Sequence, residues 1–276
     1  MDFWRLILKF LDTEMTTPKP YGWYHLFCLL LTAGLAVLAV WRGRRHSESK
    51  IRHTVFWTAV AVALLEVYKQ VNFTFGDGST APVYQWYAFP WQFCSTPMYA
   101  GLLTGIFRRG RIHRSLCAYL ATYCVFAGIG VMLYPVTVFI ETVGINIQTM
   151  VCHGSMVVIG VYLLGSGYVK AELRTVLKAL PVFLCGVILA GMMNQVAYAN
   201  GITDFNMFFI SPYEQCTLPV YAVIHEALPF PVNLLIYILG FSLAALVMIL
   251  PAIVIRRIRP ENRIEIGRAR LNSSHL

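Results

Sequence analysis

Apolar residues fall into seven stretches along this chain, and each stretch is long enough to cross a bilayer as a helix. We place them at about 24–41, 54–71, 89–107, 115–134, 146–168, 176–198 and 229–255. A transmembrane helix needs ~20 mainly apolar residues, whereas a membrane β-barrel shows shorter segments of alternating hydrophobicity. The pattern predicts an all-α fold, a polytopic membrane protein with a seven-transmembrane-helix bundle over residues 21–258.

Polar residues that are costly in hydrocarbon interrupt these stretches near one common end of the bundle. They are Glu66, Lys69, Gln70, Gln92, Cys94, Cys152, His153, Ser155, Asn194, Gln195 and Asn233. Polar and ionisable groups inside a bilayer normally face a bundle interior or a water-filled cavity. Because several helices contribute such groups at a similar depth, the sequence predicts a polar pocket.

Composition and charge place that pocket in a membrane and on one side of it. The chain has 276 residues, is 58% hydrophobic and only 13% charged, with a net charge of +9. Lys and Arg cluster at 42–52, 108–114, 170–178 and 256–259, whereas 72–88, 135–145 and 199–228 contain neither. By the positive-inside rule this alternation predicts an outside N-terminus, an inside C-terminus and a pocket in the outer leaflet. We expect a multi-pass protein of a cell membrane, of the bacterial plasma-membrane type, whose positive charge does not indicate nucleic-acid binding.

The two ends of the chain are set apart from the bundle. Residues 1–20 form an interfacial amphipathic segment, because the apolar side chains of its first turns share one helical face. Residues 259–276 form a basic tail, and its last residues resemble a translated sequencing adapter, so no function is assigned to them.

Metal and cofactor sites are not indicated by the sequence. None of the seven cysteines forms a CxxC pair, and His225 and Glu226 lack a third ligand at a fixed spacing. We therefore expect no metal and no cofactor.

A thiol and an imidazole at matching depth suggest nucleophilic catalysis. From the helical rise, Cys94 lies roughly 7–8 Å below Phe89 and His153 lies about 10 Å below Asn146. The imidazole could take the thiol proton, and the thiolate could attack an ester carbonyl to give a thioester, with Glu66 orienting the imidazole. An apolar-packed cysteine and a histidine bonded to a backbone carbonyl have the same sequence signature.

Further polar residues are candidates for binding the substrate. An oxyanion or a lipid headgroup could be held by Gln92, Lys69, Ser155, Asn194, Gln195, Asn206 and Asn233. Glu66 and Lys69 are three residues apart on one helix and can pair with each other. Alternatively, Lys69 reaches a lipid phosphate at the interface and leaves Glu66 free for His153.

Two segments resemble a known family. Phe89-Pro90-Trp91-Gln92-Phe93-Cys94 and the segment from Asp204 to Pro212 resemble motifs of the YwaF-like integral membrane proteins. Distant eukaryotic relatives of that family are described as cysteine-dependent transmembrane lipid acyltransferases, and the resemblance implies Cys94 as nucleophile and His153 as base. The chain departs from the family at Gln92, where a histidine is frequent, and at Met207, where a tyrosine is usual.

Two functions of different classes follow. The first is a Cys/His lipid acyltransferase or acyl hydrolase that takes membrane lipids, a phospholipid or a lysophospholipid, as substrate. The second is a non-enzymatic bundle that binds or transports a lipid or small solute. A retinal-type sensor is disfavoured, because the stretch 229–255 contains no lysine for a Schiff base.

Overall fold

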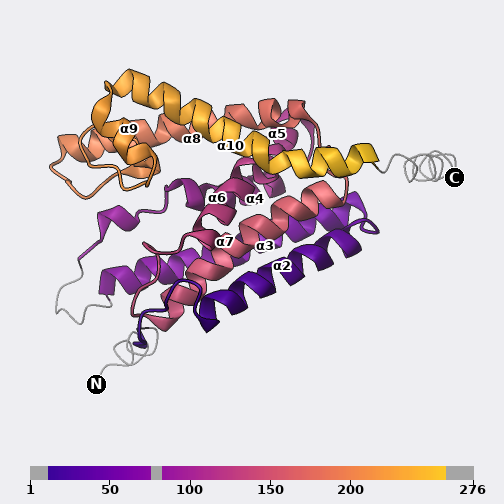
Figure 1. Cartoon of the computed structure of the whole chain (residues 1–276), viewed down its shortest axis with the longest axis horizontal. Coiled ribbons are helices and arrows are strands. Elements are labelled where there is room, and N and C mark those ends of the chain that lie inside the picture. The colour runs from indigo at the N-terminus through magenta and orange to yellow at the C-terminus, as the bar shows by residue number, and fades with distance from the viewer. Residues whose placement is uncertain (1–11, 76–82, 259–276) are drawn as a thin grey trace, which may run out of the picture.

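The computed structural model describes residues 12–75 and 83–258, and within these the regular structure is entirely helical (Figure 1). Among the described residues, six helical segments are long and apolar enough to cross a membrane. They are α2 (Trp23–Gly43), α3 (Glu48–Phe75), the consecutive pair α5 (Gly110–Leu120) and α6 (Tyr123–Leu133), α7 (Val143–Gly165), α8 (Leu173–Ala199) and α10 (Phe230–Ile258). The prediction of an all-α membrane protein is confirmed.

The stretch expected to cross at 89–107 differs from the other six. Its α-helix, α4, comprises only Thr96–Ile106, and two 3-10 turns, η1 (Trp86–Ala88) and η2 (Phe93–Ser95), precede it. Pro90 disfavours helix in the residue before it, and Pro97 lies in the first turn of α4, where proline is tolerated. Eleven residues give about 16 Å of helix, roughly half the thickness of a bilayer core. Cys94 therefore lies in an irregular segment just before a half-length helix.

The expected helix in the N-terminal segment lies largely outside the described residues. Residues 12–20 are described and are not helical, and Glu14 forms an isolated antiparallel bridge with Thr142. The tail at 259–276 also lies outside the described residues.

Helix α7 organises the bundle. It packs against α2, α3 and α6, while α4 packs against α3 and α5, and α8 packs against α5 and α10 (Figure 1). We call the end that carries residues 83–95, 134–142 and 200–229 the loop end, and the end that carries 44–47, 107–109 and 166–172 the basic end. The short helix α9 (Tyr221–Ala227) lies at the loop end.

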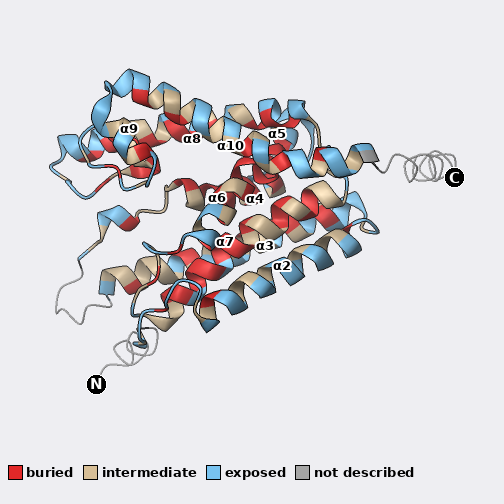
Figure 2. Cartoon of the chain, in the orientation of Figure 1, coloured by how far each residue is buried: buried red, intermediate tan, exposed pale blue. Residues whose placement is uncertain are grey.

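Burial is concentrated in the middle of the bundle (Figure 2). Helices α5, α6 and α7 carry most of their length buried, whereas α2 and α10 expose large apolar side chains such as Trp23, Leu30 and Leu239. Apolar side chains on the outer helices suit a lipid environment, in which they have no need of a protein partner.

Glycine 160 sets the close approach of α6 and α7. A Cβ at this position would clash with Val125 and lie 2.8 Å from the Leu120 carbonyl oxygen, whereas a Cβ at Gly130 of α6 meets nothing within 4 Å. We expect Gly160→Ala to lower the free energy of unfolding by about 1–3 kcal/mol through overpacking. Gly130→Ala is the matched control and should be neutral or stabilising by up to about 1 kcal/mol. Thermal unfolding in detergent micelles measures both, and equal losses would contradict the close approach.

Candidate functional site

Two thiols face one small cavity among α3, α4 and α7, which we call the thiol cavity. Its volume is about 30 Å³, and Cys94, Cys152, Ser155 and Thr58 are its polar lining residues. The remaining lining is apolar, including Val62, Met98 and Met156. A cavity of this size holds about one or two water molecules. A lipid ester can therefore reach the thiols only if neighbouring side chains move aside.

The irregular segment before α4 positions Cys94. The Ser95 N–H donates to the Gln92 carbonyl at 2.8 Å, and the Thr96 hydroxyl donates to the Phe93 carbonyl at 2.8 Å, which closes the tight turn around the cysteine. Cys94 is partly accessible and precedes the N-terminal end of α4, where the helix dipole favours negative charge. The Lys69 ammonium and the Glu66 carboxylate are both within electrostatic range of the Cys94 sulfur.

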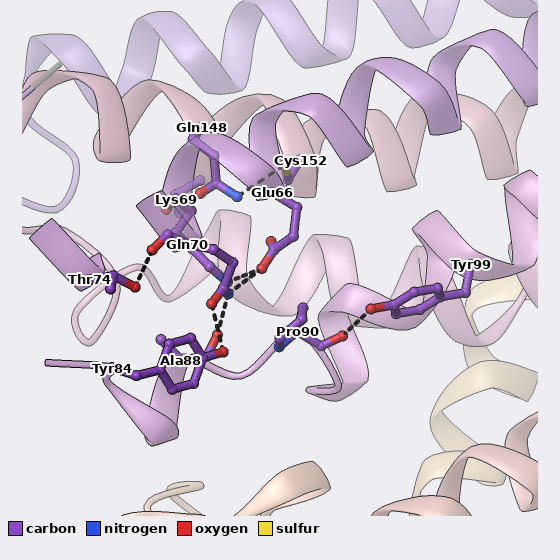
Figure 3. Close-up of polar contacts among 11 residues, drawn as sticks. Glu66, Lys69, Gln70, Thr74, Tyr84, Ala88, Pro90, Tyr99, Gln148 and Cys152 are labelled. Carbon is purple, nitrogen blue, oxygen red and sulfur yellow. Dashed lines mark hydrogen bonds and ion pairs between the residues drawn. The ribbon is translucent and has the colours of Figure 1, made fainter. Parts of the chain in front are cut away.

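Glu66 and Lys69 form an ion pair within the bundle (Figure 3). The Lys69 Nζ lies 2.7 Å from Glu66 Oε1, and the Gln70 side-chain amide donates both to the same oxygen and to the Ala88 carbonyl, each at 2.8 Å. Of the two arrangements left open by the sequence, pairing is the one observed. The Glu66 carboxylate is held by its own helix.

Tyr84 ties the loop end to this ion pair. Its hydroxyl donates to Gln70 Oε1 at 2.8 Å (Figure 3). Burial, and then the nearby Glu66 carboxylate, raise the pKa of the Tyr84 phenol. The phenol therefore stays protonated and remains a donor at neutral pH.

His153 is oriented by a backbone carbonyl, and one ring nitrogen is left free. Its Nδ1 lies 2.7 Å from the Thr149 carbonyl oxygen, which can only accept, so Nδ1 carries the proton. Its Nε2 is buried without a hydrogen-bond partner. The expected orienting role of Glu66 is thus filled by Thr149. Cys94 and His153 are not hydrogen-bonded to each other, yet the free Nε2 lone pair is the kind that a general base uses.

On α7, Cys152 lines the thiol cavity and Gln148 contacts Cys152; neither was predicted as a catalytic or binding residue, although Cys152 belongs to the polar level seen in the sequence. The Gln148 amide donates to the Cys152 sulfur at 3.4 Å, and the Ser155 hydroxyl donates to the Cys152 carbonyl at 2.8 Å. Positions 148, 152 and 155 follow an i, i+4, i+7 spacing and share one helix face. This spacing could have predicted from the sequence that Cys152 shares a helix face with Ser155, whereas the adjacent His153 lies on a different face.

Two predicted headgroup ligands instead hold the loop end together. The Gln92 amide donates to the Asn206 carbonyl and accepts from the Phe208 N–H, both at 3.0 Å. Asn194 donates to the Met207 carbonyl at 3.1 Å and accepts from the Met207 N–H at 2.7 Å. We call this arrangement the loop clamp, and it holds Phe208 at a φ of 60°.

The other predicted binding residues take part in separate contacts. Asn206 accepts from the Ser211 N–H at 2.9 Å, and Gln195 accepts from the Tyr213 hydroxyl. Asn233 donates to the carbonyls of residues 225 and 228 at 3.0 and 2.8 Å, and its own side-chain oxygen is buried without a partner. Of the predicted site residues, the structure therefore brings Cys94 and Ser155 to the thiol cavity. Glu66 and Lys69 pair with each other outside its lining, and His153 lies on an adjacent face of α7.

Another cysteine and histidine are in contact at the basic end. The Cys117 sulfur lies 3.4 Å from His113 Nε2, and the Tyr168 hydroxyl lies 2.7 Å from the same nitrogen. Cys117 and His113 are only 3% and 5% exposed. A lipid ester has no access to this pair. We therefore assign the pair a structural role, in which it connects α5 to the segment before α8.

The loop clamp gives a stability prediction. Asn194 is 1% exposed and satisfies both backbone groups of Met207. Asn194→Ala leaves the Met207 N–H and carbonyl without their hydrogen-bond partners. We expect it to lower the free energy of unfolding by about 1–3 kcal/mol. The exposed neighbour Gln195 provides the control, since Gln195→Ala should change it by at most about 0.5 kcal/mol. Denaturant unfolding in micelles compares them, and a neutral Asn194→Ala would contradict the clamp.

Comparison with known proteins is informative at the level of the family. Among residues 12–75 and 83–258, no three His, Cys, Asp or Glu side chains come together as metal ligands. No curated protein and no solved structure matches the chain. The model of the TMEM164 family, a family of transmembrane proteins, matches residues 17–250, which is most of the bundle. This chain belongs to the TMEM164 family.

Proposed function

We propose that this protein is a membrane-embedded lipid acyltransferase or acyl hydrolase with Cys94 as its nucleophile. The observation that carries the proposal is the position of the Cys94 thiol, which lines an interior cavity and lies within electrostatic range of the partly buried Lys69 ammonium. Cys152 lines the same cavity from within α7, whereas Cys94 directly precedes the N-terminal end of α4, where the helix dipole favours negative charge. The resemblance of residues 89–94 to the YwaF-like proteins supports the same assignment.

The residues supply each part of a two-step acyl transfer. His153 Nε2 takes the thiol proton, and the thiolate attacks the ester carbonyl carbon of a phospholipid. The ester C–O bond breaks, and the leaving lysophospholipid oxygen takes the proton back from His153. A lysophospholipid hydroxyl, or water in a hydrolase, then attacks the thioester, and its proton passes through His153 to the departing thiolate.

The ion pair and the basic connections support the remaining parts of the proposal. Lys69 stabilises the oxyanion, and Glu66 holds Lys69 in place through the 2.7 Å ion pair. His153 and Cys94 must meet through a bridging water or through a shift when substrate enters. We place the reaction in the outer leaflet of a cell membrane, with the N-terminus outside and the α4 segment as the third of seven crossings, because the basic connections alternate along the chain.

Lipid turnover in proteoliposomes tests the proposal. Purified protein is reconstituted with a phospholipid deuterated in one acyl chain and an unlabelled lysophospholipid, and the lipids are followed by mass spectrometry. We expect the deuterated chain to appear in the acceptor lipid or as free fatty acid. The alternative, a bundle that binds or transports lipid, predicts stabilisation by phospholipid with no chemical turnover. That outcome would rule out the enzyme.

A further inference from the structure

We propose that the groove between α2, α3 and α7 holds the acyl chain that is carried on Cys94, an inference that rests on the proposed function. The groove has a volume of about 410 Å³, and Leu35, Ala39 and Val158 are among its lining residues. We call it the acyl groove. It is far larger than the thiol cavity, so it offers the space for a chain that the cavity itself lacks.

The lining of the acyl groove suits a hydrocarbon occupant. Three of its hydroxyl groups donate within their own helices: Thr54 to the Lys50 carbonyl and Thr58 to the Thr54 carbonyl, both at 2.9 Å, and Ser155 to the Cys152 carbonyl at 2.8 Å. Few free donors therefore face the groove, and a polar solute would lose its hydration without gaining partners. A lipid chain has no polar groups whose hydration would be lost.

The acyl groove shares more of its lining with the thiol cavity than a groove of about 460 Å³ beside Glu66 and Gln70, which shares only Met98. Thr58, Ser155 and Ile159 line both the acyl groove and the thiol cavity. A groove of about 340 Å³ between α4, α5 and α8 shares no lining residue with the thiol cavity. Two of the three shared residues have small side chains, so the partition between thiol and groove is thin there. A chain whose carbonyl carbon is bonded to Cys94 has its shortest way out through this partition.

The end of the acyl groove nearer the basic end of the bundle is polar and narrow. The Tyr162 hydroxyl lies 2.9 Å from His46 Nδ1, and Arg42 also lines this end. A Cβ at Gly43 would lie 2.7 Å from the Tyr162 ring, so α2 and α7 are already in close contact there. Apolar lining therefore ends at the basic end of the bundle. This polar, narrow end limits the length of chain that fits, and we assign the groove the selection of acyl-chain length.

Photo-crosslinking tests occupancy independently of turnover. The probe is a phospholipid that carries a diazirine at the end of one acyl chain, in vesicles of unlabelled phospholipid. Ala39→Trp fills the groove, and Ala33→Trp, on an exposed and non-lining position of the same helix, is the matched control. We expect crosslinks on lining residues of α2 and α7 in the wild type and in Ala33→Trp, and at least about tenfold fewer in Ala39→Trp.

The outcomes separate the groove from the enzyme. Crosslinks in the groove without any turnover would support chain binding and contradict the proposed function. Turnover with crosslinks spread evenly over the lipid-facing helices, and unchanged by Ala39→Trp, would overturn the groove and leave the enzyme standing. Val158→Trp fills the groove from α7 and replaces Ala39→Trp if that variant does not fold. In an active protein, either filling variant should shift the preference toward shorter acyl chains.

Discussion

Cys94→Ala should abolish acyl transfer, reducing turnover by about three orders of magnitude or more. The reason is chemical, since alanine cannot form the thioester, and the second thiol of the cavity, on Cys152, is carried by another helix, α7. Protein stability should change little, because Cys94 makes no hydrogen bond with His153 and its thiol faces a cavity. Turnover of a deuterated phospholipid in proteoliposomes measures the effect.

Cys152→Ala is the matched control, because this second thiol lines the same cavity. Its sulfur accepts from the Gln148 amide, which suits a structural role. We expect its turnover to stay within about tenfold of wild type, well short of the loss from removing a nucleophile. If Cys152→Ala loses turnover and Cys94→Ala keeps it, the nucleophile has been assigned to the wrong thiol.

Glu66→Gln should destabilise the bundle by about 3–5 kcal/mol, because it leaves the Lys69 ammonium buried without its counter-charge. Both side chains are largely buried, at 11% and 17% exposure. Equilibrium denaturation in mixed micelles measures the free energy of unfolding. Replacing both residues, as in Glu66→Gln with Lys69→Met, should recover part of the loss, since no unpaired charge remains.

The same helix supplies the control for this ion pair. Glu48 and Arg52 of α3 lie 3.7 Å apart, but the Glu48 side chain is 65% exposed. Glu48→Gln should cost less than about 1 kcal/mol, as surface pairs do. Equal losses from Glu66→Gln and Glu48→Gln would mean that the Glu66–Lys69 pair is solvated and that no buried cation lies beside Cys94.

Hydropathy predicted the positions of the long helices, but it did not predict that the stretch at 89–107 is helical over only part of its length. The windows at 54–71 and 146–168 lie within or close to α3 and α7. The window at 89–107 is equally apolar, yet only Thr96–Ile106 is an α-helix. Apolar composition sets where a chain enters lipid, whereas Pro90 and Pro97 set where its backbone can be helical.

The sequence also predicted only some of the contacts that the polar residues make. Their common level was visible in the sequence, and Cys94 and Ser155 do line one cavity. Gln92 and Asn194 have other partners, because the irregular loop at 206–208 needs its backbone groups satisfied. Those partners are remote in the sequence, with 116 residues separating Gln92 from Phe208. Local spacing carries no information about such contacts.

The most direct test of the account is the mass of the Cys94 peptide after the protein has been mixed with phospholipid and rapidly quenched in acid. We predict that a fraction of this peptide gains the mass of one acyl group and loses it on treatment with neutral hydroxylamine, as a thioester does. The Cys152 peptide should remain unmodified in the same sample. Phospholipid turnover with an acyl group on Cys152, or with Cys94 never acylated, would contradict the account.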